Sequence, residues 1–143
     1  MPSDRALRLM NRAHRFMLKA TGGRMGWFAN GMPMLELTTT GRKSGVKRST
    51  MLSSPMRLHG SYIVVASRGG DDTHPSWYHN LVADPQVSVV LQGDPAKPYR
   101  ARVATEHERA ELWPQITAKH PNYAGYQKRT EREIPLVFLD PVD

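Results

Sequence analysis

The sequence contains no cysteine. Disulfide bonds, thiol nucleophiles and thiolate metal ligands are therefore excluded from its 143 residues. A domain without disulfides suits a reducing compartment, so we expect the protein to lie inside the cell, in the cytoplasm.

Long apolar runs are also missing. No stretch approaches the roughly 18 to 20 consecutive apolar residues that a membrane-spanning helix requires. The first residues lack the apolar block of a secretory signal as well. The pattern therefore predicts neither a transmembrane protein nor an exported one.

The common catalytic motifs are absent too. The chain has neither the Gly-x-Ser-x-Gly of serine hydrolases nor the Gly-x-Gly-x-x-Gly of dinucleotide-binding folds. His74 and His79 are not spaced as zinc ligands on a helix, and no second histidine follows His107 at the required distance. These absences argue against a hydrolase, a Rossmann-type dehydrogenase and a metal site.

Positive charge, by contrast, is abundant. The formal net charge is +7, and hydrophobic residues make up 39% of the chain, enough for one folded core. Such a protein attracts an anionic partner: nucleic acid, a lipid surface, or a small molecule carrying phosphate or carboxylate groups. Nucleic acid is the least favoured of these, because the aromatic residues do not alternate with the basic residues as stacking platforms would.

The first twenty residues carry two stripes. Basic residues recur every three or four positions from Arg5 to Lys19, and apolar residues recur likewise from Ala6 to Ala20. This pattern predicts an amphipathic helix that either docks on the core or lies on an anionic membrane surface. We therefore divide the chain into an N-terminal helix with a glycine-rich linker, residues 1–30, and a folded domain, residues 31–143.

From residue 34 the hydrophobic period changes to two, which is typical of strands. We predict strands over 34–40, 46–53, 56–59, 61–66, 87–91, 99–103 and 134–139, the first four forming a meander. Helices are predicted over 75–82, from Thr105 onward and through Tyr123 and Tyr126. The pair Thr105 and Glu108 caps the second helix, which Pro114 should kink or restart. The order predicts an α+β domain whose antiparallel sheet curls into a barrel.

Two basic, glycine-flanked turns carry the strongest chemical signal. Four cations fall within the seven residues 42–48, after Gly41, and a second turn spans 67–70. Glycine lets the backbone approach a ligand, and arginine and lysine bind phosphate or carboxylate oxygens. Ser76 and Trp77 stand at the start of the next helix, where backbone amides attract anions. The first turn is therefore either an anion cradle or a solvated basic hairpin.

Four ordered blocks together resemble the deazaflavin-dependent nitroreductase family, the flavin/deazaflavin oxidoreductases of the A type. The resemblance runs from about residue 35 to the C-terminus. It implies a split β-barrel of the FMN-binding-like kind, with flanking helices and the N-terminal amphipathic helix. The blocks are Leu37–Gly45, Val65–Gly70, His74–Leu81 with Asp84 and Pro85, and His120–Gln127.

The resemblance also implies the coenzyme, reduced 8-hydroxy-5-deazaflavin, written F(420), whose tail carries a phosphate and several glutamates. Lys43, Ser44 and Arg48 should hold the phosphate region, with Arg42 and Lys47 near the glutamates. The residues implied to bind the coenzyme are, in full, Arg42, Lys43, Ser44, Gly45, Lys47, Arg48, Met51, Ala66, Ser67, Arg68, Gly69, Ser76 and Trp77.

The implied reaction is hydride transfer to a small hydrophobic, electron-poor acceptor such as a quinone, an enone or a nitroaromatic compound. Tyr123 and Tyr126 match tyrosines of the family's substrate pocket, where a phenol stacks on the acceptor or helps to deliver a proton. At two further positions where the family's pocket has tyrosine, this chain has Ser53 and His120. The alternative reading is a split barrel that binds FMN or haem, and the sequence leaves the oligomeric state open.

Overall fold

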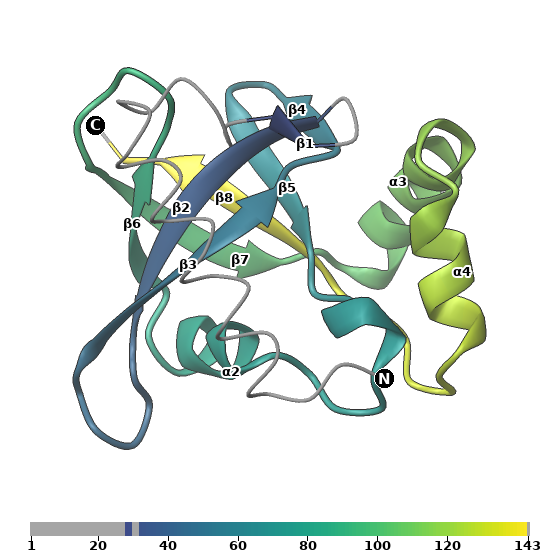
Figure 1. The fold of residues 1–143 in the computed structure, drawn as a ribbon, viewed down its shortest axis with the longest axis horizontal. Helices are drawn as coiled ribbons and strands as arrows, with labels where there is room; N and C mark the ends of the chain where they lie inside the picture. Colours follow the sequence, from purple (N-terminus) through teal and green to yellow (C-terminus); the bar gives the residue numbers. More distant parts are fainter. Residues whose placement is uncertain (1–27, 30–31, 143) are drawn as a thin grey trace.

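Strands and helices follow one another as the hydrophobic periods predict (Figure 1). The computed structural model describes residues 28–29 and 32–142. Its strands are β1 (Phe28–Ala29), β2 (Met32–Thr40), β3 (Lys47–Ser53), β4 (Met56–Leu58), β5 (Ser61–Val65), β6 (Gln86–Val90), β7 (Lys97–Val103) and β8 (Leu136–Pro141). Its helices are the short 3-10 helix η1 (Arg68–Gly70), α2 (Ser76–Ala83), α3 (Glu106–Lys119) and α4 (Asn122–Lys128).

The strands of the described chain form one antiparallel sheet. Its order is β1-β2-β6-β7-β8-β5-β4, and β3 pairs with β2 away from this path. The predicted α+β architecture with an antiparallel sheet is therefore confirmed. The predicted meander is wrong in one place: β2 pairs with β3, and β4 pairs with β5, but β3 leads into β4 without pairing to it.

Ser54 explains this departure. It lies between β3 and β4 with only 2% of its surface exposed. Its N–H donates to the carbonyl of Pro33 in β2 at 2.9 Å, and its hydroxyl donates to the carbonyl of Ile63 in β5 at 2.8 Å. At this residue the chain therefore crosses from the edge of the sheet that holds β2 and β3 to the edge that holds β4 and β5. The two hydrogen bonds of Ser54 join these edges and close the sheet into a barrel.

Ser54→Ala should lower the free energy of unfolding by about 1–3 kcal/mol, because a buried carbonyl loses its donor. Ser88→Ala, at a half-buried serine of β6, serves as the control and should change it by less than about 0.5 kcal/mol. Urea unfolding followed by circular dichroism measures both variants. Equal stability of the two variants would show that the Ser54 hydroxyl does not hold the barrel closed.

Two apolar clusters lie on opposite faces of the sheet. Alternation along β5 and β8 sends Val64 and Val137 into one cluster, and Ile63 and Leu136 into the other. The inner cluster consists of Leu35, Leu37, Val64, Leu81, Val87, Val89, Tyr99, Ala101, Val137 and Leu139. The outer cluster consists of Met32, Ile63, Val65, Leu112, Ile116, Tyr123, Ile134, Leu136 and Phe138.

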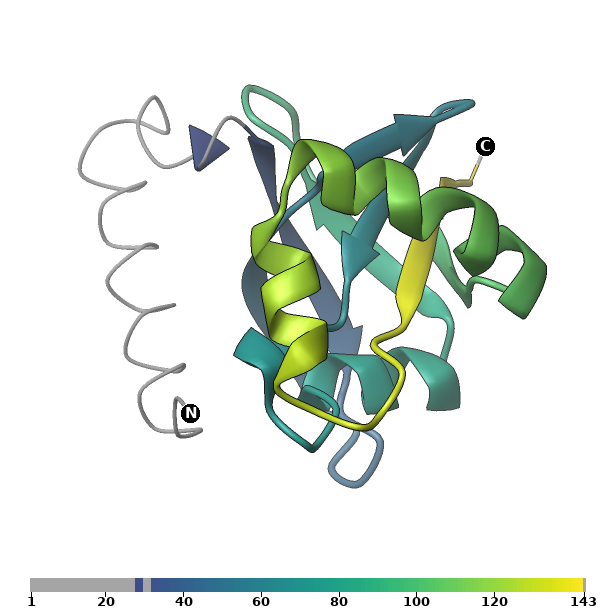
Figure 2. The ribbon, with the colours of Figure 1, turned by 90° about the vertical axis from the view of Figure 1, so that its right-hand side faces the viewer.

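The helices cover these clusters. α2 packs on the inner cluster through Leu81, which is 2% exposed, and lies across the lower end of the barrel in Figure 1. α3 and α4 cover the outer face of β5 and β8, as Figure 2 shows. The predicted capping box of α3 is confirmed: Glu108 N–H donates to Thr105 Oγ1 at 3.1 Å, and Thr105 N–H donates to Glu108 Oε1 at 2.9 Å.

Of the two outcomes predicted for Pro114, a kink or a restart of the helix, the restart is wrong. One helix runs from Glu106 to Lys119 with Pro114 inside it. Pro114 and Ala110 both lie on the exposed face, where water can bond the Ala110 carbonyl that has lost its partner. The N-terminal amphipathic helix falls outside the described residues. Within 28–29 and 32–142, no helix is long and apolar enough to cross a membrane.

Candidate functional site

The turn between β2 and β3 is closed by two backbone hydrogen bonds. Gly41 N–H donates to the carbonyl of Val46, and Gly45 N–H donates to the carbonyl of Gly41, both at 2.8 Å. Gly45 has a φ of 71°, which glycine adopts without the steric penalty of other residues. The turn therefore projects from the barrel, and all four of its cations, Arg42, Lys43, Lys47 and Arg48, are exposed.

Two polar side chains of this turn make hydrogen bonds within the hairpin itself. The Ser44 hydroxyl accepts a hydrogen bond from Val46 N–H at 3.1 Å, and Lys47 Nζ donates to Thr40 Oγ1 at 2.9 Å. Met51, further along β3, is 6% exposed and packs with Met34 in a small separate cluster. The predicted tail-binding residues are therefore accessible to a ligand, whereas Met51 lies beneath the surface.

Asn80 ties the turn to α2. Its Oδ1 accepts a hydrogen bond from Arg42 N–H at 3.1 Å, and its Nδ2 donates to Thr39 Oγ1 at 3.2 Å. The side chain is 7% exposed, so both contacts are sheltered from water. Asn80 was not predicted as a site residue, since nothing in the local pattern of α2 indicates a partner in the distant hairpin.

The second turn, after β5, has an unusual backbone. Ser67 is in the right-handed region, with φ −80° and ψ −37°, and Arg68 and Gly69 follow with φ 47° and 66°. This order turns successive N–H groups to one side, the geometry of an anion-binding nest. The Arg68 guanidinium is held by Asp71 at 2.7 Å and by Thr73 Oγ1 at 2.6 Å.

The two basic turns and α2 share one end of the barrel. Figure 1 and Figure 2 both place the β2–β3 turn, α2 and η1 at the lower end. Ser76 is exposed at the start of α2, while Trp77 is half-buried against the inner cluster. The structure therefore gathers the segments that were predicted to bind the coenzyme.

Three of the four predicted acceptor residues form a row of rings, with His120 just before α4 and Tyr123 and Tyr126 on it. The His120 and Tyr123 rings lie 6.4 Å apart, and the Tyr123 and Tyr126 rings 6.0 Å apart, each pair edge to face. Ser53 comes from β3, where its hydroxyl contacts Met34 Sδ at 2.9 Å. Tyr123 contacts Met32 Sδ at 3.6 Å through its own hydroxyl, so Ser53 and Tyr123 each contact a methionine of β2.

The two tyrosines differ in burial. Tyr123 is 6% exposed and belongs to the outer cluster, whereas Tyr126 is half-buried. Burial raises the pKa of Tyr123 to about 12, and the neighbouring Tyr126 adds to the shift. The Tyr123 phenol therefore keeps its proton at neutral pH, and Tyr126 is the more accessible hydroxyl.

The raised pKa of Tyr123 predicts a loss of stability in alkali. Between pH 10 and about 12 the unfolded chain releases this proton while the folded chain retains it. The free energy of unfolding should therefore fall with rising pH, by at most about 1.4 kcal/mol per pH unit from this group. Urea unfolding across this range should show a shallower decline for Tyr123→Phe, and equal slopes would contradict the assignment.

Gly70 brings the second turn against α4. Its φ is 86°, and a Cβ atom built on it would lie 2.6 Å from the Tyr126 carbonyl oxygen and 3.0 Å from the Arg129 Cβ atom. Only glycine permits so close an approach at that φ. The helix that carries Tyr126 is thus seated directly on the turn that carries Ser67 and Arg68.

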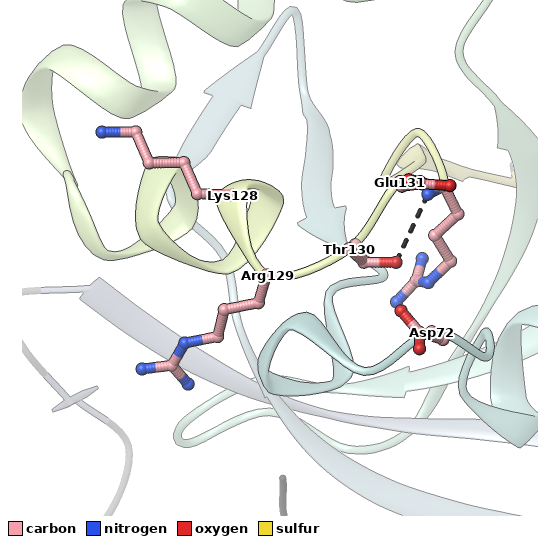
Figure 3. A pocket seen from close by; sticks show the side chains of 6 residues that line it. Asp72, Lys128, Arg129, Thr130 and Glu131 are labelled. Atoms are coloured by element: carbon pink, nitrogen blue, oxygen red, sulfur yellow. Dashed lines mark hydrogen bonds between the residues drawn. The ribbon is translucent and has the colours of Figure 1, made fainter.

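An open hollow of about 540 Å³ lies beyond the end of α4 (Figure 3). There the Thr130 hydroxyl accepts a hydrogen bond from Arg132 N–H at 3.3 Å. Charges of both signs surround the space, and none of the residues predicted for coenzyme or acceptor lines it. The lining residues are Asp72, Lys128, Arg129, Thr130, Glu131 and Arg132.

Comparison with known proteins assigns the chain to a family. The model of the F(420)H(2)-dependent quinone reductase family matches residues 9–141. The chain is 39% identical over 134 residues to an F(420)H(2)-dependent quinone reductase of Mycobacterium tuberculosis, covering 90% of this chain and 87% of the relative. The resemblance to deazaflavin-dependent reductases is therefore confirmed.

Two solved structures agree. An F(420)H(2)-dependent reductase of the FDR-A type is 43% identical, with a TM-score of 0.65 over 76% of this chain and 94% of that one. A structure described as a domain-swapped dimer is 37% identical, with a TM-score of 0.67 over 92% of this chain and 96% of that one. The split-barrel fold is thereby confirmed, and reduced F(420) is the coenzyme of the family. The chain belongs to the F(420)H(2)-dependent quinone reductases.

Proposed function

We propose that this protein transfers a hydride from reduced F(420) to a quinone, with an added proton completing the quinol. The observation that carries the proposal is the exposed four-cation turn, which Asn80 ties to α2 at the end of the barrel where the second turn also lies. An acidic coenzyme fits this end, because exposed cations and a nest of N–H groups both lie there.

The turn at 42–48 is proposed to hold the acidic tail. Lys43, Ser44 and Arg48 take the phosphate, and Arg42 and Lys47 attract the glutamates. Supporting this, all five side chains are exposed, and Gly41 and Gly45 shape the turn that presents them. Salt should weaken such contacts, since at moderate ionic strength the attraction between exposed charges decays over about 10 Å.

The head of the coenzyme is proposed to lie toward the second turn and α2. When bound, F(420) supplies two electrons as a hydride, and the protein orients it. Ser67, Arg68 and Gly69 would line one side, with the fully buried Ala66 beneath them, and Ser76 and Trp77 would line the other.

The acceptor is proposed to bind along the ring row beside α4. Ser53, His120 and Tyr123 would shape the pocket, and Tyr126 would contact the acceptor and help to deliver its proton. Supporting this division, Tyr126 is more exposed than Tyr123, whose hydroxyl contacts Met32.

Anaerobic mixing of reduced F(420) with a short-chain quinone tests the function. We expect enzyme-dependent oxidation of the coenzyme, measured by the return of its absorbance, with slower reduction of nitroaromatic compounds. Tyr126→Phe should lower turnover about a hundredfold or more, the lower end of what a positioned proton donor contributes, while leaving coenzyme affinity unchanged. Absence of turnover with every quinone, enone and nitro compound tried would refute the proposal.

Residues 1–30, which end with β1 of the sheet, are proposed to rest on an anionic membrane surface, with residues 31–143 as the coenzyme-binding domain in the cytoplasm. The basic and apolar stripes of the sequence support this. Removing residues 1–30 should abolish binding to vesicles rich in anionic lipid. Equal binding of the shortened and full chains would exclude the segment as the membrane contact.

A further inference from the structure

The guanidinium of Arg132 reaches the second turn from the loop between α4 and β8. Its Nε donates to the Asp71 carbonyl at 2.7 Å, Nη2 to the Ser67 carbonyl at 2.8 Å and Nη1 to the Ala66 carbonyl at 3.2 Å. Nη1 also lies 3.0 Å from His74 Nδ1. Burial, followed by the charge of Arg132, lowers the pKa of His74, so the ring stays neutral and accepts this bond. The Arg132 side chain therefore donates hydrogen bonds to four acceptors.

The direction of two backbone N–H groups follows from these contacts. The Ala66 and Ser67 carbonyls share peptide units with the N–H groups of Ser67 and Arg68. The described chain has no cis peptide, and in a trans peptide the carbonyl and N–H point in opposite directions. Holding both carbonyls on Arg132 therefore turns both N–H groups away from it.

Arg132 is itself fixed in place. Gln127 Nε2 donates to its carbonyl at 2.7 Å, and Gln127 Oε1 accepts from Ile134 N–H at 2.9 Å. Arg109 Nη2 donates to the same Oε1 at 3.0 Å. This network joins the end of α4 to the loop, so the guanidinium meets the turn from a rigid support.

Arginine suits this position better than lysine. A guanidinium presents five N–H donors in one plane and keeps its charge, whereas an ammonium group is a point charge on a flexible stem. Only the planar group can meet three carbonyls of residues 66–71 and the His74 ring together.

We propose that Arg132 is a positioning residue for the coenzyme, which by holding the Ala66 and Ser67 carbonyls aims the Ser67 and Arg68 N–H groups at an electron-rich oxygen of F(420). The inference rests on the proposed function. It adds a residue that does not touch the coenzyme and acts through the backbone of the turn.

The test is titration of the purified full chain with oxidised F(420), followed by coenzyme fluorescence. Arg132→Lys and Arg132→Ala should each raise Kd about tenfold or more. Free guanidinium, at a concentration that does not denature the protein, should restore binding to Arg132→Ala, and ammonium at equal ionic strength should not. Arg102→Lys is the control: Arg102 bonds the carboxylates of Glu108 and Asp140, and its Kd should match the wild type.

Backbone NMR supplies a second measurement that needs no variant. Adding F(420) to the wild type should shift the amide signals of Ser67 and Arg68. Unchanged signals, or folded Arg132 variants that bind as the wild type does, would overturn the inference while leaving the proposed function intact. No binding of F(420) to the wild type would overturn the proposed function and the inference with it.

Discussion

Replacing Lys43 and Arg48 together by alanine is expected to weaken F(420) binding by about a hundredfold or more. Each charge-assisted hydrogen bond to the tail contributes about 1.5–3 kcal/mol, and 1.4 kcal/mol corresponds to a tenfold change in Kd. Both side chains are exposed, so their loss should leave the fold unchanged. Fluorescence titration measures Kd, and thermal unfolding checks the fold.

The control removes the same charge elsewhere. Lys97 and Arg100 are exposed on β7, and the turn that leads into β7 lies at the opposite end of the barrel from the β2–β3 turn (Figure 1). Lys97→Ala with Arg100→Ala should change Kd little. Equal weakening by the two double variants would mean that net charge, and not a built tail site, attracts the coenzyme.

Gly70→Ala should reduce both stability and turnover. A left-handed φ costs a non-glycine residue about 1–2 kcal/mol. The new methyl group would also overlap the Tyr126 carbonyl, and overpacking costs about 1–3 kcal/mol more. Because relief requires α4 to move off the second turn, we expect quinone reduction to fall at least about tenfold, as misplacement of about 1 Å can cause.

Gly93→Ala separates strain from contact. Gly93 has a φ of 79°, and a Cβ atom there would meet nothing within 4 Å. Gly93→Ala should therefore lose only the stability that the left-handed φ costs, and its turnover should equal that of the wild type. If Gly93→Ala and Gly70→Ala behaved alike in stability and in turnover, the seating of α4 on the turn would have no functional importance.

Local patterns predicted most of the fold. The alternation of Leu35 and Leu37 with polar neighbours marked β2, and the Thr105 and Glu108 pair marked the start of α3. Proline was the weaker guide. Pro114 was accommodated on an exposed helix face. Pro98 lies inside β7, which begins at Lys97 and not at Tyr99, because Lys97 and Pro98 pair with Val89 and Ser88 of β6. The Pro98 carbonyl also accepts a hydrogen bond from Val142 N–H.

The site was predictable only where its residues are neighbours in sequence. The basic turns could be found from their composition, and the His120–Tyr126 segment from its resemblance to the family. The other site residues contact partners far away in the sequence. Asn80 bonds Arg42, 38 residues away, and Gly70 lies against Tyr126, 56 residues away. Arg132 bonds Ser67, 65 residues away. No local period carries such information, since each partner is decided by how the sheet folds.

Competition between F(420) and FMN for the wild-type protein shows which coenzyme this barrel binds. The fluorescence of oxidised F(420) reports its binding, and FMN is added as the competitor. We expect tight F(420) binding that excess FMN does not displace. Preference for FMN, or no binding of F(420), would contradict it and would indicate a split barrel that has kept the fold and changed its coenzyme.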